Sequence, residues 1–495
     1  MTASTDPAAA DAAPASPAAI PAGCPVTGSG SGPGPGPGSG PDAGPDTGGT
    51  TAPRARLPIP RTARASRTET LRFVATHTLP AFVRGVVSPR PPVLAAYAAL
   101  DQAAWSAATL RALRARHGGA PVRVRGLSGE VLVLLDPADV RTFFALPVPV
   151  LAMDADDKKR AFSAFEPDGV LCTHGELRER LRRVNDEVLG WDQPVHPSCA
   201  EYLAVVEEEC ASLTHGGTLP YGRIQRVLTR ISRRLVLGDR AAGDEEFGGW
   251  LTALRAEGNW MGLRTGRRAA TRALYERASA RIAEYAADAP AHTLAARALR
   301  TDNPPGTDPL AQTHHWLAAL DACAPVAART LMLLAAHPAE QEAAALVPAD
   351  AEPQDMDRLR ACVQESLRLY PLVPDLVRVT RAETEWRGVH HPPGTTVLVP
   401  IGFHQRDPAH VAGADLFVPG RWLRPEADRD TATAPFSHGG GRCPGDQLGL
   451  LLTAAVCARV LRDHRITGAR PRLDPVGPLP GAVDTPAIRL TLRPR

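Results

Sequence analysis

One short segment of the chain combines residue types that are suited to binding a metal cofactor. It reads FSHGGGRCPG and covers residues 436–445, with three consecutive glycines before Cys443 and Pro444-Gly445 after it. Apolar residues at helical spacing follow, so we expect Cys443 to lie at the N-terminus of a helix, where a thiolate is favoured. Glycines let the backbone lie close to a bulky planar ligand. The alternative interpretation is a turn that holds a buried structural cysteine.

The spacing of this segment resembles the haem-binding loop of the cytochrome P450 superfamily. Phe436 stands seven residues before Cys443, and Gly445 stands two residues after it. The resemblance implies that Cys443 is the axial thiolate ligand of a haem b iron, with Phe436, Arg442 and Gly445 beside the cofactor. One position departs from the family pattern. The residue two before the cysteine, which is usually basic, is Gly441, and Arg442 follows it.

A second motif is Glu365-Ser-Leu-Arg368, in which the glutamate and the arginine face each other on a predicted helix. The same spacing occurs at other places in the chain, so alone it is not specific. The family adds a second arginine from the segment before the cysteine, and FVPGRW places Arg421 there, 22 residues before Cys443. By resemblance, Glu365, Arg368 and Arg421 form a structural triad.

Three arginines are candidates for binding the haem propionates. Arg378 lies in a predicted strand ten residues after Arg368, where the family has a propionate-binding arginine. Arg182 in LRERLRRVNDEVL matches the arginine of a second propionate-binding helix, and Arg178 falls where that helix often has a histidine. A guanidinium can bind a carboxylate through two hydrogen bonds. The alternative for the helix is a solvated charged face.

The apolar segment 314–337 predicts a central buried helix, although it is long enough to cross a bilayer. By resemblance, Ala318 to Ala322 form the oxygen-binding stretch. Asp321 keeps the acid of the family, but Ala322 replaces the threonine that usually relays protons. Pro325 removes the helix hydrogen bond to the Asp321 carbonyl, which could then hold a water. The alternative is a simple kink in a buried helix.

Composition excludes several classes of function. The net charge is +3 and aromatic residues make up 5% of the chain, so we expect no binding of nucleic acid. The eight cysteines include no C-x-x-C pair, which excludes the usual zinc spacing and fits a reducing cytoplasm. The first twenty residues lack the features of a signal peptide, and we expect no transmembrane span.

The resemblance and the patterns together predict a mainly α fold with minor β-sheets, in a single large domain. Residues 1–66 are rich in Pro, Gly and Ala and predict a disordered tail, and residues 67–495 form the haem-thiolate domain. An arginine-rich stretch, residues 54–72, leads into the first helix. It is either a membrane-surface element or a solvated basic edge. Strands are expected around residues 122–135 and 377–399. Helices are expected at 174–190, 200–213, 221–237, 245–257 and 266–287.

The predicted function is that of a monooxygenase that takes electrons from a separate ferredoxin or flavodoxin with its reductase, because no nicotinamide or flavin motif is fused to the chain. Its substrate is a small organic molecule in an apolar pocket lined by Leu376, Val377, Ala318 and Ala319, with residues 475–482 as a lid. One alternative is a haem peroxygenase that uses hydrogen peroxide, which Ala322 favours. Another is a haem-binding protein without turnover.

Overall fold

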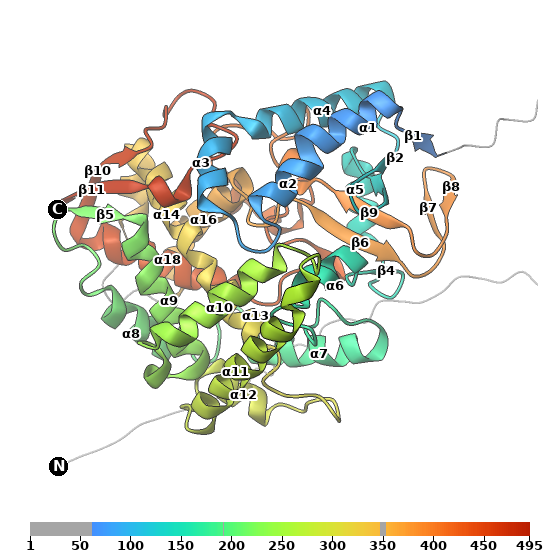
Figure 1. The fold of residues 1–495 in the computed structure, drawn as a ribbon. Coiled ribbons are helices and arrows are strands. Elements are labelled where there is room, and N and C mark those ends of the chain that lie inside the picture. Colours follow the sequence, from blue (N-terminus) through green and yellow to red (C-terminus); the bar gives the residue numbers. More distant parts are fainter. Residues whose placement is uncertain (1–61, 192, 347–352) are drawn as a thin grey trace, which may run out of the picture. The chain divides into compact units, whose positions relative to one another are not determined.

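The computed structural model describes residues 62–191, 193–346 and 353–495, which belong to one compact unit that begins at Ile59. Helices make up most of the unit (Figure 1). They are α1 (Arg67–Phe73), α2 (Leu79–Arg84), α3 (Pro91–Ala99), α4 (Gln102–Arg116), α5 (Pro137–Ala145), α6 (Asp156–Phe162), α7 (Gly175–Leu189), α8 (Cys199–Cys210), α9 (Tyr221–Leu237), α10 (Glu245–Gly258), α11 (Arg268–Ala287), α12 (Leu294–Arg300), α13 (Thr313–Asp321), α14 (Cys323–Ala336), α15 (Pro338–Ala344), α16 (Asp357–Leu369), α17 (Ile401–His404) and α18 (Asp446–Asp463).

The strands form three small sheets among the described residues. They are β1 (Ala63–Arg64), β2 (Val122–Arg125), β3 (Glu130–Val133), β4 (Leu151–Ala152), β5 (Thr218–Pro220), β6 (Leu376–Thr380), β7 (Thr384–Trp386), β8 (Val389–His391), β9 (Thr396–Val399), β10 (His464–Arg470) and β11 (Arg489–Pro494). The largest sheet has the order β1-β2-β3-β9-β6-β4, and the others are β10-β11-β5 and β7-β8. The mainly α fold with minor sheets is confirmed.

The start of the folded unit differs from the prediction. Ala63 and Arg64 pair in parallel with Val122 and Arg123 of β2, so they already belong to the largest sheet. Ser66 then accepts a hydrogen bond from the backbone of Glu69, whose side chain accepts one from the backbone N–H of Ser66. Paired residues therefore begin before residue 67, and the local sequence does not reveal this because β1 pairs with residues 59 positions later in the chain. The predicted disorder of residues 1–61 lies outside the described residues.

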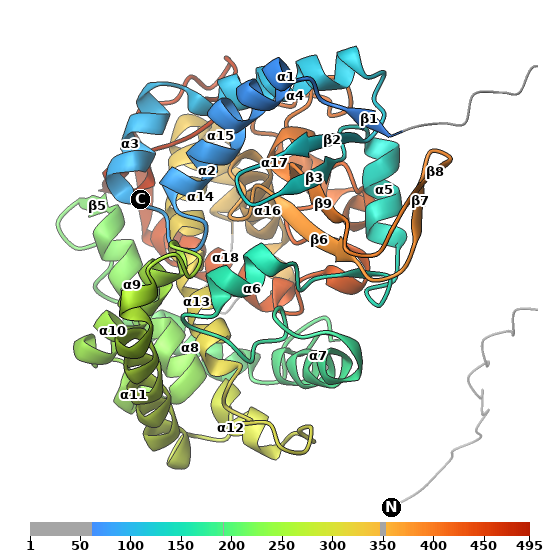
Figure 2. The same cartoon turned by 45° about the vertical axis from the view of Figure 1, so that its right-hand side comes forward.

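The helical core gathers around α14, which packs against α9, α16 and α18 (Figure 2). Helix α9 shows why these residues form this core. Its apolar residues Ile224, Leu228, Ile231 and Leu235 recur at three- and four-residue spacing, and all four are buried. The predicted helices in residues 174–287 are present as α7 to α11.

The predicted central helix is interrupted. The segment divides at Ala322 into α13 and α14, and the Ala322 N–H donates to the Ala318 carbonyl at 3.3 Å. Pro325 explains the break, because it has no N–H to donate to the Asp321 carbonyl. Among the described residues, Thr313–Ala336 is the one stretch that is long and apolar enough to span a membrane, and two thirds of its most apolar window is buried inside the protein.

The first helical segment keeps apolar residues on two faces. Helices α1 and α2 are joined by a π-helical turn at Val74–Thr78, and Phe73 and Pro80 are buried. Leu71 and Leu79 are exposed to 69% and 45%.

Candidate functional site

A cavity of about 1620 Å³ lies between the cysteine loop and helices α13 and α14. Cys443 faces it, together with Phe436 and Gly445 of the loop. The wall formed by the interrupted helix includes Ala318, Ala319 and Ala322, as well as Asp321, Cys323, Pro325 and Val326. Because alanine side chains are short, this wall leaves space for a bulky planar group. Leu376 and Val377 also line the cavity, as predicted.

The cysteine loop is held by one backbone hydrogen bond and by glycines at crowded positions. The Cys443 N–H donates to the Phe436 carbonyl at 2.9 Å, and helix α18 begins at Asp446. Gly439 has a φ of +62°, and a Cβ there would overlap the Phe144 carbonyl oxygen. Burial raises the pKa of the Cys443 thiol to about 11, while the Gly445 N–H acts in the opposite direction. Desolvation thus opposes the thiolate, whereas the N–H groups of the helix N-terminus favour it. A cation bound to the sulfur would be needed to hold it.

Two of the predicted cationic residues have unbonded nitrogens near the loop. Arg378 on β6 donates to the Phe143 carbonyl at 3.0 Å, but its Nη2 is buried and makes no hydrogen bond to the described residues. A Cβ at Gly441 would overlap the same Nη2, so the glycine leaves room for Arg378. Arg178 on α7 donates to the Gly440 carbonyl at 3.2 Å, and its buried Nε has no partner among the described residues. Both arginines line the cavity.

The other two predicted cations are paired with protein groups. Arg182 donates to Asp186 at 2.7 Å and to the Arg442 carbonyl at 2.8 Å. Arg442 donates to Asp446 at 2.8 Å, and both guanidiniums lie over the Trp191 ring. Both arginines line the cavity, but their charges are already partly neutralised. The structure thus favours Arg178 over Arg182 as an anion-binding group, whereas the family pattern favoured Arg182.

Lys158 on α6 is a further cation at this wall, which the sequence analysis missed. Its Nζ donates to the Val377 carbonyl at 3.2 Å, and it lines the cavity. Burial, together with the neighbouring Arg378, lowers the pKa of Lys158 to about 8. In the sequence, Lys158 stands in the charged run DADDKKR, which is typical of a solvated helix end, so no signal distinguished it.

Asp321 points toward helix α10, where its carboxylate accepts a hydrogen bond from Arg255 at 2.8 Å. Both side chains line the cavity and are about one fifth exposed. Burial raises the pKa of Asp321, whereas Arg255 acts to lower it. Ala322 brings no hydroxyl to this wall, so Asp321 is the acidic group that precedes the break in the helix.

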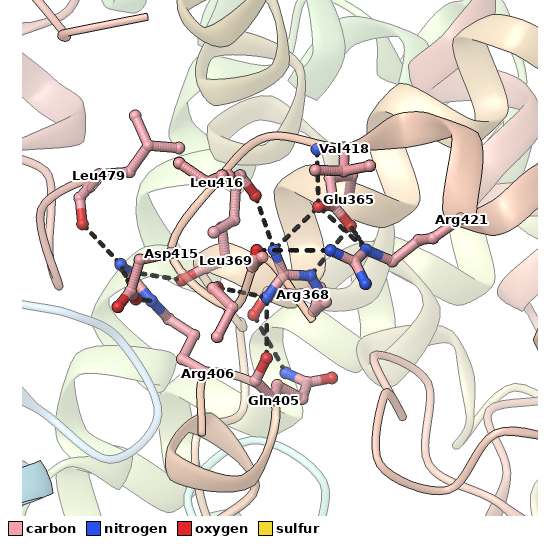
Figure 3. Close-up of polar contacts among 12 residues, drawn as sticks. Glu365, Arg368, Leu369, Gln405, Arg406, Asp415, Leu416, Val418, Arg421 and Leu479 are labelled. Carbon is pink, nitrogen blue, oxygen red and sulfur yellow. Dashed lines mark hydrogen bonds and ion pairs between the residues drawn. The ribbon is translucent and has the colours of Figure 1, made fainter. Parts of the chain in front are cut away.

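Glu365, Arg368 and Arg421 meet in one network (Figure 3). Arg368 donates to both Glu365 oxygens, at 2.9 and 2.8 Å, and Arg421 Nε lies 3.1 Å from the same carboxylate. Trp422 Nε1 and the Val418 N–H also donate to it, at 2.8 and 2.9 Å. The predicted contact among the three residues is present. None of the three lines the cavity, so their geometry fits a structural role.

The predicted lid was wrong. Residues 475–482 do not line the cavity, although Thr485 and Pro486 just beyond them do. The Leu479 N–H donates to the Asp415 carbonyl, which ties this stretch to another loop. Many residues between positions 77 and 94 do line the cavity, a range that includes the end of the π-helical turn, α2 and the start of α3.

These observations test whether the site fits a haem. A haem needs one axial ligand, space for a flat macrocycle and cations for two carboxylates. Cys443, the alanine wall and the unbonded nitrogens of Arg178 and Arg378 supply all three. Among the described residues, no three His, Cys, Asp or Glu side chains gather at metal-binding spacing. An iron at Cys443 would therefore take its remaining ligands from a macrocycle.

Comparisons with known proteins agree with this site. The family model for Cytochrome P450 matches residues 318–475, which include the interrupted helix, the triad and the cysteine loop. Curated relatives include cytochrome P450 monooxygenase FCK2 of Fusarium pseudograminearum, which is 38% identical over 112 residues, 22% of this chain and 20% of the relative. The mitochondrial sterol 26-hydroxylase of Homo sapiens is 30% identical over 26% of each chain. The matches thus span about a fifth to a quarter of these relatives.

Solved structures match over a longer part of the chain. The retinoic acid-bound cyanobacterial CYP120A1 aligns with a TM-score of 0.61 at 17% identity and covers 77% of this chain and 93% of its own. Cytochrome P450SP alpha (CYP152B1), in complex with (R)-ibuprophen, aligns with a TM-score of 0.59 at 18% identity and covers 78% and 96%. These likenesses concern the fold, and the family model concerns the site. Fold, cysteine loop and family model agree that the chain belongs to the cytochrome P450 superfamily.

Proposed function

We propose that this protein is a haem-thiolate monooxygenase that acts on a mainly apolar organic substrate. The observation that carries the proposal is the position of Cys443 on one cavity wall, with the unbonded nitrogens of Arg178 and Arg378 beside it. When bound, haem b would supply the oxidation chemistry, and the Cys443 thiolate would donate electron density to its iron. The cytoplasmic location predicted from the cysteines remains part of this proposal.

The chain itself would supply binding, orientation and protons. Arg178, Arg378 and Lys158 would hold the two propionates, because each is a cation on the same wall. Apolar residues such as Leu376 and Val377 would orient the substrate and exclude water. The Asp321 carboxyl, held by Arg255, would accept a proton from solvent and pass it into the cavity.

The reaction balances with an external electron donor. One substrate C–H bond, one dioxygen, two electrons and two protons give one C–OH group and one water. We propose that the electrons come from a ferredoxin or a flavodoxin with its reductase.

A peroxygenase is the second candidate, and a specific observation favours it. Ala322 has no hydroxyl, and the neighbouring Asp321 is engaged with Arg255, so the usual acid–alcohol pair is missing from this wall. A peroxygenase takes both the oxygen atom and the electrons from hydrogen peroxide, and it needs no reductase. The third candidate is a haem-binding protein without turnover. A product assay distinguishes it from the two enzymes, because it would form no product.

Isotope labelling tests these functions. The haem-loaded protein is first screened with a metabolite extract for substrates that shift its Soret band. Each hit is then incubated with ¹⁸O₂ and a ferredoxin system, or with H₂¹⁸O₂ alone. Monooxygenase activity predicts one ¹⁸O atom per product molecule in the first reaction. Label from peroxide only would replace our proposal with the peroxygenase, and no product in either reaction would favour a non-catalytic protein.

A further inference from the structure

The cavity contains a second group of cations, on elements that do not carry the cysteine loop. Arg84 lies at the end of α2, and Arg329 lies on α14, six residues beyond Cys323. At 1.5 Å per residue this is about 9 Å along the helix axis. Both side chains line the cavity. Neither arginine is among the residues that would bind the haem.

Neither arginine is neutralised by a protein carboxylate in direct contact. The Nε of Arg84 is buried, and its guanidinium makes no hydrogen bond or ion pair with the described residues. Arg329 donates from Nε to the Thr485 hydroxyl at 2.8 Å and from Nη1 to the Tyr370 carbonyl at 3.0 Å, which are both neutral acceptors. Burial lowers the pKa of both guanidiniums, that of Arg329 to about 10. An uncompensated charge away from water is costly, which points to an anion from outside the chain.

The nearby charges give this part of the wall a net positive charge. Asp375 is the acidic residue of this part of the wall, and its Oδ1 lies 3.3 Å from His77 Nε2. It acts on Arg84 through space. Two arginines and one aspartate leave a net charge of +1, and protonation of His77, whose pKa Asp375 raises, adds to it. The site is therefore cationic, and a carboxylate would lower its net charge.

A neutral donor stands in the same region. Tyr221 at the start of α9 lines the cavity and acts electrostatically on Arg329. Burial raises the pKa of its phenol, so the hydroxyl stays protonated and can donate a hydrogen bond to a carboxylate oxygen. Most of the remaining lining is apolar and includes Phe73, Leu94 and Leu251.

We propose that Arg84 and Arg329 anchor the carboxylate of an otherwise apolar substrate. In the cavity, Arg178, Arg378 and Lys158 would then hold the haem propionates, and Arg84 and Arg329 would hold the substrate acid. The inference rests on the proposed function only in calling the bound acid a substrate. Binding itself can be measured without turnover.

The experiment compares acids with their esters on the haem-loaded protein. Decanoate, dodecanoate and tetradecanoate are titrated by calorimetry beside their methyl esters, which keep the apolar body and lose the charge. We expect the acids to bind at least tenfold more tightly than the esters. Arg84→Gln should abolish the preference, and because Arg84 holds no hydrogen bond, this variant should fold normally. Asp375→Asn should strengthen binding of the acids.

Arg160 offers a matched control. It lines the same cavity and is about half exposed, and it pairs with Asp157. Arg160→Gln should keep the preference for acids. Arg329→Lys keeps the positive charge but loses the guanidinium hydrogen bonds to Thr485 and Tyr370. It should weaken acid binding less than Arg329→Gln does. A wild-type protein that binds none of the acids, or binds acids and esters equally, overturns the inference. An Arg84→Gln variant that keeps the preference does the same. Neither result depends on oxygen transfer, which the labelling experiment tests separately.

Discussion

The Asp321 carboxylate on α13 accepts a hydrogen bond from Arg255 on α10, across the cavity wall and directly before the break at Ala322. This contact joins the acid that precedes the break to a helix that is remote in sequence. It determines what substitutions at Asp321 should do.

We expect Asp321→Asn to slow product formation, on the order of tenfold or more, and to raise the share of electrons lost as hydrogen peroxide, because the acid is removed at constant size. Pro325→Ala should act in the same direction by restoring the helix bond to the Asp321 carbonyl. Product per electron consumed is the measurement. Arg255→Gln is the control, since it breaks the ion pair and keeps the acid. If the Asp321→Asn and Pro325→Ala variants both turn over normally, protons do not pass through this site. Proton delivery by a hydroxyl group of the substrate would then be the favoured explanation.

Cys443→Ser should abolish the red-shifted Soret band of the reduced carbon monoxide complex, because a serine oxygen cannot replace the thiolate as axial ligand. Cys323→Ser is the matched control, since Cys323 is a second thiol that lines the same cavity. Its spectrum should keep the band. Survival of the band in Cys443→Ser would show that the ligand has been misassigned.

Glu365→Ala should lower the free energy of unfolding by about 3–5 kcal/mol, because it leaves buried Arg368 without its carboxylate. Haem content should fall with it. Asp415→Ala removes the partly exposed partner of Arg406 in the same region and should cost under about 1 kcal/mol. Urea unfolding compares the two variants. A fully haem-loaded and stable Glu365→Ala protein would contradict the structural role of the triad.

Deleting residues 1–60 should leave thermal stability and haem content nearly unchanged, because Ala63 is the first paired residue in the part of the chain that the structure describes. Deleting residues 1–66 removes β1 and the Ser66 cap, and this longer deletion should cost about 1 kcal/mol from the cap alone. Differential scanning calorimetry of both truncations separates the two boundaries. A large loss in the shorter truncation would show that the N-terminal segment packs on the folded unit.

Acid should destabilise the protein between about pH 6.5 and pH 4. Burial lowers the pKa of His196, His314 and His404 to about 4 each, so the unfolded chain binds protons before the folded protein does. Stability is therefore complete above pH 6.5 and falls as the pH drops, by about 1.4 kcal/mol per pH unit for each histidine. His404→Asn should show a smaller loss of unfolding free energy between pH 7 and 4.5 than wild type.

The cysteine loop and the triad could be predicted because their chemistry depends on short, fixed spacing. Phe436 to Gly445 is a continuous segment, and Glu365 and Arg368 share one helix face. The long amphipathic helices could be predicted for the same reason, since the three- and four-residue spacing of their apolar residues is visible within each segment. These features need no knowledge of how distant segments meet.

The remaining site residues could not be predicted, because they act through contacts between distant segments. Lys158 reads as part of a solvated run until β6 brings the Val377 carbonyl to it. Arg255 becomes a partner of Asp321 only when α10 crosses α13. One signal was present for Arg329, a lone arginine in the most apolar helix of the chain. The lid failed because its Pro-Gly composition indicates a loop but does not say which wall the loop covers.

Arg368 has a consequence beyond the site. Besides Glu365, it donates to the carbonyls of Gln405, Ala414 and Leu416, which lie in a long segment of short turns (Figure 3). Residues 405–423 form no β-strand whose backbone hydrogen bonds could fix their conformation. The Arg368 side chain of α16 therefore holds three of their carbonyl groups in place. We expect the amides of residues 405–423 and of α16 to exchange with deuterium as a single cooperative unit. A loop that looks irregular would then open only when a helix opens with it.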